Sequence, residues 1–223
     1  MSPGATAVSV LPYRDRQEGA SHLALHLKRF AGAGTVVFGI PRGGVPIAAE
    51  IAEALGAPLD IVVARKLGSP FSPELAIGAV TADGGCFLNY DVLNMLSVSN
   101  GFLHAEIDRQ LRDAKARDLR FRGRQAPTPV RGRVALVCDD GLATGATMHA
   151  AVRALRSRGA ARIVVAVPVG SSQACQSLAG EADEVICPEQ PEPFGAVGQH
   201  YLHFEPVDDD AVARLLQSPE KSR

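Results

Sequence analysis

Five short runs of apolar and β-branched residues recur along the chain, and polar or glycine-rich segments separate them. Each run has the continuous hydrophobic pattern of a strand that is buried on both faces, as the strands of parallel sheets are. We therefore expect five core strands. The runs are 35–40, 59–64, 134–138, 162–167 and 184–187.

The segments between these runs carry apolar residues at helical spacing. Asp15, with Glu18 three positions later, resembles a capping box, and Pro46 suits the first turn of a second helix. Further helices are predicted at about 146–158 and 171–178. This alternation of strands and helices predicts a three-layer, doubly wound α/β fold, with a mainly parallel five-stranded core sheet and right-handed crossovers.

Two stretches depart from the alternation. Residues 71–80 and 86–88, with a glycine-containing turn between them, predict an antiparallel edge hairpin. Residues 100–124 are strongly helical and rich in Arg and Lys. We expect one domain over 1–223, with a core at 12–187, a basic helical insertion at about 99–125, a hood at 188–207, and a closing helix and tail at 208–223.

Composition narrows the choice of partners and compartment. The chain has 223 residues with 23 basic against 24 acidic side chains and a formal net charge of −1, which argues against a nucleic-acid partner. No segment resembles a signal peptide, and no apolar run approaches the ~20 residues that cross a bilayer. The cysteines lack metal-binding spacing and are expected to be reduced. We expect a cytoplasmic protein without a membrane partner.

The most informative stretch is 134–147, which reads VALVCDDGLATGAT. Its apolar strand ends in Asp139 and Asp140, at the edge of the sheet where ligands bind in such folds. The small residues that follow allow backbone N–H groups to converge on an anion at a helix N-terminus, with two threonine hydroxyls as further donors. The two carboxylates suit sugar hydroxyls or a divalent cation. A phosphorylated sugar satisfies both halves of the motif.

A second glycine turn follows the strand at 35–40. It reads Pro41-Arg42-Gly43-Gly44 and precedes a helix, so a second helix N-terminus faces the same edge of the sheet. Arg42 adds a guanidinium that suits phosphate. Arg65 and Lys66 follow the strand at 59–64 and add two more cations. We infer a second anion site at this edge.

Other readings of the acids fit less well. The sequence contains neither GxxxxGK[ST] nor GxGxxG, so the P-loop and Rossmann motifs are missing. A simple helix cap would leave the second acid unexplained. A phosphohydrolase that forms an aspartyl phosphate resembles a D-x-D-x-T pattern, whereas this chain has Asp140-Gly141-Leu142.

The stretch DDGLATGAT resembles the phosphoribosyl pyrophosphate (PRPP) signature of type I phosphoribosyltransferases. The order of GIPRGG, ARKLGSP, PELAIGAV, this signature and FGAVG is similar to a group of bacterial predicted phosphoribosyltransferases whose acceptor is not settled. The resemblance runs from Tyr13 to about Val207. It implies an antiparallel edge strand beside the core sheet and a small C-terminal hood.

The resemblance also implies a role for each matching residue. Asp139 and Asp140 would hold the ribose hydroxyls and bind the metal, directly or through water. The 5′-phosphate would lie on Ala143, Thr144, Gly145, Ala146 and Thr147. Pyrophosphate would lie on Arg42, Gly43, Gly44, Arg65 and Lys66. The catalytic set implied in this way is Asp139, Asp140, Arg42 and Lys66.

These roles describe a Mg²⁺-dependent transferase that displaces pyrophosphate from C1 of PRPP with a nitrogen nucleophile, as in nucleotide salvage. Its partners would be PRPP and a small-molecule acceptor, and we keep a homodimer open. Phe194 and Tyr201 in the hood either stack on an aromatic acceptor or pack beneath a loop. The alternative is a regulator on the same fold that senses PRPP or a nucleotide without turnover.

Two further expectations concern single positions. Ala143 stands where enzymes for 6-oxopurines resemble one another in carrying an aspartate that handles the N7 proton. Such bases are therefore expected to be poor acceptors, unless Glu74 or a hood carboxylate replaces that aspartate. The basic residues of 112–124 form either a solvated face or a set that closes over the pyrophosphate. They include Lys115, Arg117, Arg120, Arg122 and Arg124.

Overall fold

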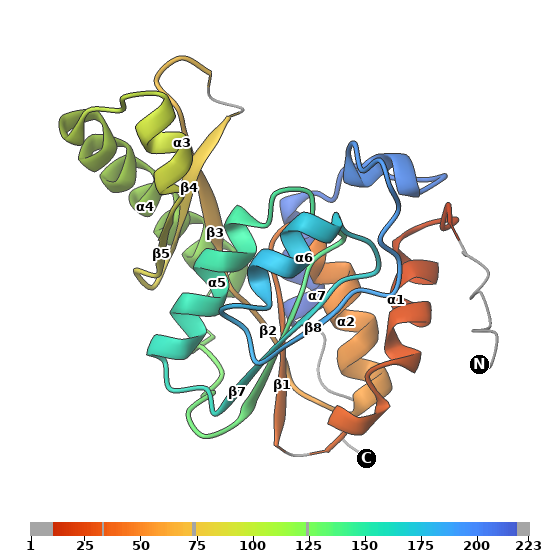
Figure 1. The fold of residues 1–223 in the computed structure, drawn as a ribbon. Coiled ribbons are helices and arrows are strands. Elements are labelled where there is room, and N and C mark those ends of the chain that lie inside the picture. The colour runs from red at the N-terminus through yellow and green to blue at the C-terminus, as the bar shows by residue number, and fades with distance from the viewer. Residues whose placement is uncertain (1–10, 33, 73–74, 124, 218–223) are drawn as a thin grey trace.

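The computed structural model describes residues 11–32, 34–72, 75–123 and 125–217. A five-stranded parallel sheet forms its centre, with the strand order β2-β1-β6-β7-β8 (Figure 1). This order confirms the predicted doubly wound, mainly parallel core. The strands are β1 (Thr35–Gly39), β2 (Leu59–Ile61), β6 (Val134–Cys138), β7 (Arg162–Ala166) and β8 (Glu184–Ile186).

Helices cover both faces of this sheet. Successive strand residues point to opposite faces, so Val37 and Leu136 pack toward one pair of helices, whereas Val36 and Val137 pack toward the other. Because both faces are covered, the strands are mainly apolar instead of alternating between apolar and polar residues. On one face lie α1 (Arg16–Leu25), the short helix η1 (Lys28–Phe30) and α2 (Gly44–Leu55), and on the other α5 (Ala146–Ser157) and α6 (Ser172–Leu178).

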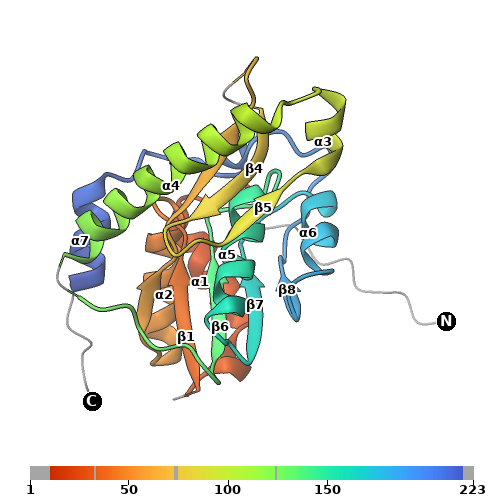
Figure 2. The ribbon, with the colours of Figure 1, turned by 90° about the vertical axis from the view of Figure 1, so that its left-hand side faces the viewer.

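A second, antiparallel sheet projects from the core together with two helices, and we call this part the arm (Figures 1 and 2). Its long helix α4 has 23 residues but is strongly polar. No helix in the described part of the chain is both long and apolar enough to cross a membrane. The arm consists of β3 (Ala64–Gly68), β4 (Ala76–Thr81), β5 (Cys86–Leu88), α3 (Tyr90–Met95) and α4 (Asn100–Arg122).

The predicted antiparallel hairpin forms, because β4 pairs with β5, but it joins β3 in a separate sheet instead of lying at the edge of the core sheet. The apolar run at 59–64 pairs with the core only as far as Ile61. The chain then crosses at Val62 and Val63 and enters β3, whose Ala64 lies opposite Thr81 of β4. The sequence hides this crossing, since both valines are as buried as the strand that they leave.

A buried ion pair fastens the end of α4 to the core. Arg122 pairs with Asp60 of β2, donates to the carbonyl of Ile61 at 2.7 Å, and donates to Asp118 at 2.8 Å. Asp60 also accepts a hydrogen bond from the amide of Thr128 at 2.7 Å. A buried pair with all its partners present is strongly destabilising to break. Arg122 therefore holds the arm in place and does not close over a ligand.

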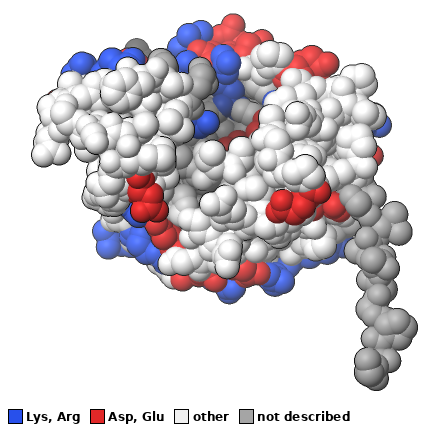
Figure 3. Space-filling model, turned by 45° about the horizontal axis from the view of Figure 1, so that its top comes forward, with Lys and Arg blue, Asp and Glu red and all other residues white. Residues whose placement is uncertain are grey.

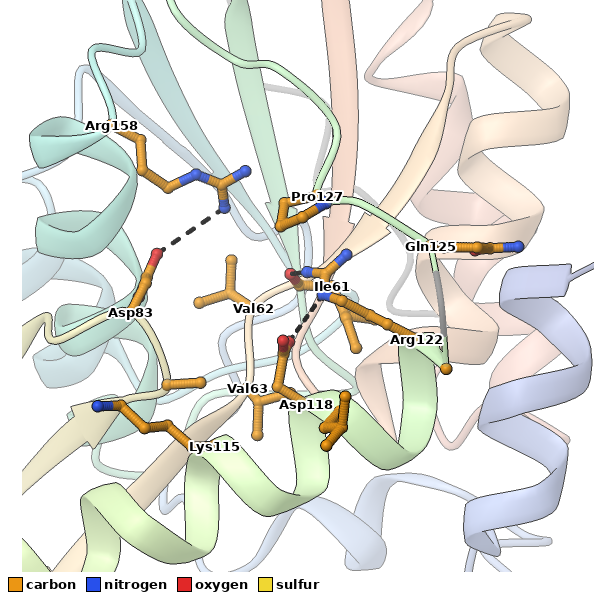
Figure 4. A pocket seen from close by; sticks show the side chains of 13 residues that line it. Ile61, Val62, Val63, Asp83, Lys115, Asp118, Arg122, Gln125, Pro127 and Arg158 are labelled. Carbon is orange, nitrogen blue, oxygen red and sulfur yellow. Dashed lines mark hydrogen bonds and ion pairs between the residues drawn. The ribbon is translucent and has the colours of Figure 1, made fainter.

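A cavity of about 400 Å³ lies beside this ion pair, between α4, the crossing after β2 and the end of α5 (Figure 4). Lys115 lines it from α4, and Arg158 at the end of α5 points toward Asp83 across it. No residue of the sequence-predicted site lines this cavity. Lys115 thus faces a different part of the molecule from the predicted acids.

The C-terminal part of the chain returns to the carboxyl edge of the core sheet (Figure 1). The hood, residues 188–207, contains the short helix η2 (Val197–His200). An isolated bridge between Tyr13 and Tyr201 ties it to the start of the chain. Helix α7 (Asp209–Gln217) follows and packs through the buried Val212 on α2 and α4. Hood and closing helix thus flank the edge where the two glycine turns lie.

Candidate functional site

The two glycine turns lie next to each other at the centre of the carboxyl edge. β1 and β6 are neighbours, and the chain winds outward from them in opposite directions, which is where open α/β sheets form a ligand crevice. We call residues 41–44 the RGG loop and residues 139–147 the DD loop. The amide of Ile40 donates to the carbonyl of Cys138 at 3.0 Å, so both loops leave the sheet side by side. Figure 3 shows a hollow on this side, with basic and acidic side chains at it.

Asp139 and Asp140 begin the DD loop, and Arg16 forms an ion pair with Asp140. The amide of Asp140 donates to Oδ1 of Asp139, and Nε of Arg16 donates to Oδ2 of Asp140, both at 2.9 Å. Burial raises the pKa of Asp139 well above its ordinary value and the charge of Asp140 raises it further, while Lys66 and Arg16 oppose the rise. Burial also raises the pKa of Asp140 against the effect of Arg16. A bound cation would stabilise both ionised carboxylates.

The donor set at these acids fits Mg²⁺. This ion binds oxygen ligands, keeps several waters, and is usually held by one or two carboxylates together with substrate phosphates. Among the residues that the structure describes, no group of three or more His, Cys, Asp or Glu side chains is placed to hold a metal by itself. The site therefore suits a metal that arrives with phosphate oxygens, and not a structural metal held by the protein alone.

Gly43 and Gly44 allow the RGG loop to lie against the acids. A Cβ atom on Gly43 would lie 1.9 Å from Oδ2 of Asp140. On Gly44 it would lie 2.6 Å from the carbonyl oxygen of Cys138 and 2.8 Å from the Cα of Asp139. Both glycines are therefore needed for close approach of the two loops, in addition to the anion contact predicted for them.

The end of the DD loop has the form of a backbone anion site. Gly145 has a φ of +72° and precedes α5, and no side chain caps this helix. The first N–H groups of a helix have no partner within it, and the helix dipole favours an anion there. Ala143 and Thr144 are exposed and Thr147 is half-buried, so the turn is open to a ligand. Ala146 is the first residue of the helix.

The DD loop is fixed from behind by the connection between β7 and α6. The amide of Leu142 donates to the carbonyl of Val169 at 3.0 Å. The hydroxyl of Ser171 donates to the carbonyl of Ala143 at 2.8 Å. These bonds set the course of the backbone before any ligand binds.

The three cations predicted near pyrophosphate take different directions. Arg42 is exposed in the RGG loop, and its Nη1 lies 3.5 Å from Oδ1 of Asp209 in α7. Lys66 is exposed on β3, and its positive charge opposes the rise in the pKa of Asp139. Its neighbour Arg65 points to the opposite face of the strand, and its Nε donates to Oε1 of Gln110 in α4 at 3.1 Å. The structure therefore places the charge of Lys66 near Asp139, whereas the side chain of Arg42 faces α7 and that of Arg65 faces α4.

Among the basic residues of α4, Arg120 lies beside the RGG loop. Its Nη1 is 2.9 Å from Oδ2 of Asp209, so the carboxylate that faces Arg42 also faces Arg120. Neither the pattern of α4 nor the acidic start of α7 shows this contact in the sequence, because the two segments are far apart in the chain.

The remaining candidates of this helical segment lie elsewhere. Arg117 lies close enough to Arg65 to lower its pKa, second to burial. Lys115 lines the cavity of Figure 4. Arg124, and the carboxylate of Glu74 considered for proton handling, lie outside the described residues.

The hood residues also differ in placement. Tyr201 is buried, and its hydroxyl donates to the carbonyl of Asp140 at 2.6 Å. Its ring lies with its centroid 5.1 Å from that of Phe204. Phe194 is half-buried, with its ring centroid 4.8 Å from that of His200. Tyr201 thus ties the hood to the DD loop, and a role for either ring in stacking on an acceptor stays a prediction.

Arg16 joins the site without a sequence signal. Besides its bonds to Asp140, it lies over the ring of Phe204 at 3.8 Å from the centroid and donates to the carbonyl of Glu205 at 2.9 Å. It therefore connects α1, the DD loop and the hood. In the sequence it is one of 23 basic residues and follows the capping Asp15, so only its contacts reveal it.

Comparison with known proteins points to one family. The model of the phosphoribosyl transferase domain matches residues 17–201. The crystal structure of TT1426 from Thermus thermophilus is 39% identical in sequence, with 92% of this chain and 98% of that chain covered and a TM-score of 0.79. The AQ2163 protein from Aquifex aeolicus, at 10% identity, a TM-score of 0.51 and coverage of 82% and 76%, shares the fold alone.

Two proteins from strains of Mycobacterium tuberculosis, named provisionally as phosphoribosyl transferases, are 44% identical over 204 residues. The alignment covers 92% of this chain but 46% of each relative, so the chain spans about half their length. Since the family model covers most of the chain and both loops of the candidate site, the chain belongs to the phosphoribosyl transferase domain family.

Proposed function

We propose that this protein binds PRPP together with Mg²⁺ and transfers the phosphoribosyl group to a nitrogen nucleophile with release of pyrophosphate. Asp139 and Asp140 hold the ribose hydroxyls and the metal, directly or through water. The turn at 143–147 holds the 5′-phosphate through its backbone. The RGG loop, with Arg42, and Lys66 of β3 hold the pyrophosphate.

The chemistry requires charge to separate as pyrophosphate leaves C1. Negative charge grows on the leaving group, where Arg42 and Lys66 stabilise it. Positive charge grows on the ribose ring, which the two carboxylates favour while they keep its hydroxyls in position. Mg²⁺, when bound, neutralises further charge on the pyrophosphate. The protein needs no covalent nucleophile for this step.

The observation that carries the proposal is the joining of the two loops at the switch point. Two acids with raised pKa values lie against a glycine pair that has no room for a Cβ atom, beside a helix N-terminus that no side chain caps. Carboxylates for hydroxyls, a backbone anion site and an exposed arginine side chain match the three parts of PRPP. A turn with a purely structural role would need neither the paired acids nor the uncapped helix N-terminus.

Calorimetry of PRPP at constant Mg²⁺ tests the binding half of the proposal. Asp139→Asn with Asp140→Asn removes hydrogen bonds to charged groups, each worth roughly 1.5–3 kcal/mol, and is expected to lower affinity about tenfold or more for each bond. Asp108→Asn, an exposed acid on α4, is the matched control and should bind as the unmodified protein does. Equal affinity in the double variant would contradict the assignment.

Turnover is tested with pyrophosphate release across purine, pyrimidine and pyridine bases. Release that depends on one class of base would establish transfer and identify the acceptor, and would place the protein in nucleotide salvage. PRPP binding without release with any base would favour the PRPP-sensing regulator on the same fold.

A further inference from the structure

The carboxylate of Asp209 lies between two arginines at the edge of the candidate site. Its Oδ1 is 3.5 Å from Nη1 of Arg42 in the RGG loop, and its Oδ2 is 2.9 Å from Nη1 of Arg120 in α4. Three segments that are distant in sequence therefore meet at one acidic group. The side chain of Asp209 is 15% exposed, whereas those of Arg42 and Arg120 are 43% and 62% exposed.

This arrangement is that of an anion held by two guanidinium groups. Each arginine approaches a different oxygen of the same carboxylate, so both donors already point at one small anion. The planar guanidinium group of arginine binds phosphate oxygens as readily as carboxylate oxygens, and it has five N–H donors for these contacts. Asp209 offers a single negative charge to the two arginines, and Asp210, which lies 3.8 Å from Arg120, is 80% exposed and adds little. A phosphate group would therefore match the pair better than Asp209 does.

Helix α7 does not depend on Asp209 for its position. The helix is anchored by the fully buried Val212, which packs in a cluster with Val45 and Phe121. Asp208, one residue earlier, accepts a hydrogen bond from the amide of Ala211 and so caps the helix start. The contact of Asp209 with the arginines can therefore be exchanged while α7 remains docked.

We propose that Arg120 is a second arginine of the pyrophosphate subsite and that Asp209 is its internal placeholder. In the free protein, Asp209 holds Arg42 and Arg120 together. An entering pyrophosphate displaces the carboxylate and takes both arginines, so Asp209 lowers the affinity of the subsite by competition. The inference rests on the proposed function, because it takes the RGG loop as the place where pyrophosphate binds.

Calorimetry with inorganic pyrophosphate at fixed Mg²⁺ and low salt tests the placeholder. Asp209→Asn removes the competing charge, and because partly exposed ion pairs are weak we expect affinity to rise roughly two- to fivefold. Asp210→Asn is the matched control. It lies on the same helix turn and loses the same charge, but its side chain is 80% exposed and 3.8 Å from Arg120. It should leave the affinity unchanged.

Arg120→Ala tests the second arginine and does not depend on how well the Asp209 variant folds. It should weaken pyrophosphate about tenfold, as Arg42→Ala should, with partial recovery in Arg120→Lys. Arg112→Ala, an exposed arginine on the same helix, should have no effect. A thermal melt of each variant, compared with that of the unmodified protein, tests whether the substitution leaves the fold intact.

The outcomes separate the inference from the proposed function. Unchanged or weaker pyrophosphate binding in Asp209→Asn, or normal binding in Arg120→Ala, would overturn the inference while the loss in Arg42→Ala still supports the pyrophosphate subsite. If neither the unmodified protein nor Asp209→Asn binds pyrophosphate, the proposed subsite itself fails.

Discussion

The DD loop and the RGG loop stand in equivalent places but offer an anion different groups. Each follows a central parallel strand and precedes a helix, and the two lie side by side. The DD loop ends in small residues around Gly145 and offers its backbone. The RGG loop offers the exposed side chain of Arg42, which in this structure already faces Asp209.

The backbone donors of the DD loop are fixed by the fold, whereas the direction of the Arg42 side chain depends on its contacts. Backbone donors of the DD loop are set by its bonds to Val169 and Ser171, so their direction does not depend on a competitor. The guanidinium group of Arg42 is on a flexible side chain, so it can form an ion pair with an acid of the same chain instead of with a ligand. The proposed 5′-phosphate site is thus fixed by the backbone, whereas the direction of Arg42 in the proposed pyrophosphate site can change.

The largest effect is expected for the acceptor, because the DD loop acts through its backbone and Ala143 brings no proton-handling group. A positioned general acid or base is worth about 10² to 10⁴ in rate, so hypoxanthine and guanine should be poor acceptors. Ala143→Asp should raise pyrophosphate release with hypoxanthine if that base already binds, whereas Ala143→Asn, similar in size, should not. Efficient use of hypoxanthine by the unmodified protein would contradict this.

The next largest effect concerns the packing of the two loops. In Gly44→Ala the new Cβ would meet the backbone at Cys138 and Asp139, which cannot move aside as a side chain can. Overpacking of this kind costs about 1–3 kcal/mol, so PRPP affinity should fall roughly fivefold to a hundredfold, and the melting temperature should fall with it. Gly101→Ala in α4 meets nothing within 4 Å and serves as the control. Normal PRPP binding in Gly44→Ala would mean that the loops do not need to touch.

A smaller and selective effect is expected from Arg42→Ala. Pyrophosphate affinity should fall about tenfold through loss of a charged hydrogen bond, while ribose 5-phosphate, which needs only the DD loop, should bind nearly as before. Calorimetry with the two ligands measures both. Equal losses would show that the loops do not divide the ligand between them.

The smallest effect concerns the helix behind the DD loop, where His149 is buried one turn into α5 and stacks on Phe87. Burial lowers the pKa of His149, although Glu181 opposes the shift. The unfolded chain therefore takes up this proton more readily, and stability should fall as the pH drops below about 6.5, by up to about 1.4 kcal/mol per pH unit.

The free energy of unfolding measured between pH 7 and pH 5 tests this. His149→Gln should lose less stability over that range than the unmodified protein, while the exposed His104→Gln should behave like the unmodified protein. An identical pH profile in His149→Gln would assign the acid sensitivity to other groups.

Much of the architecture, and the acids and small turn of the candidate site, could be recognised in the sequence alone. Continuous apolar runs that alternate with helical segments are typical of a parallel sheet covered on both faces, so the core strands and the helices at 146–158 and 171–178 were predictable. The neighbouring acids and the small turn carry their chemistry in adjacent residues, so they were recognisable as a unit. Local patterns of this kind need no knowledge of distant contacts.

Only the tertiary structure decided the rest, because it depends on which distant residues meet. The crossing at 62–63 and the direction of Arg65 follow from the pairing of β3 with β4, which no local pattern encodes. Arg16 reaches Asp140 from α1, and Asp209 reaches Arg42 from the opposite end of the described chain. Single charged residues look alike in a sequence, since the energy that gives each one a role comes from a partner that folding brings to it.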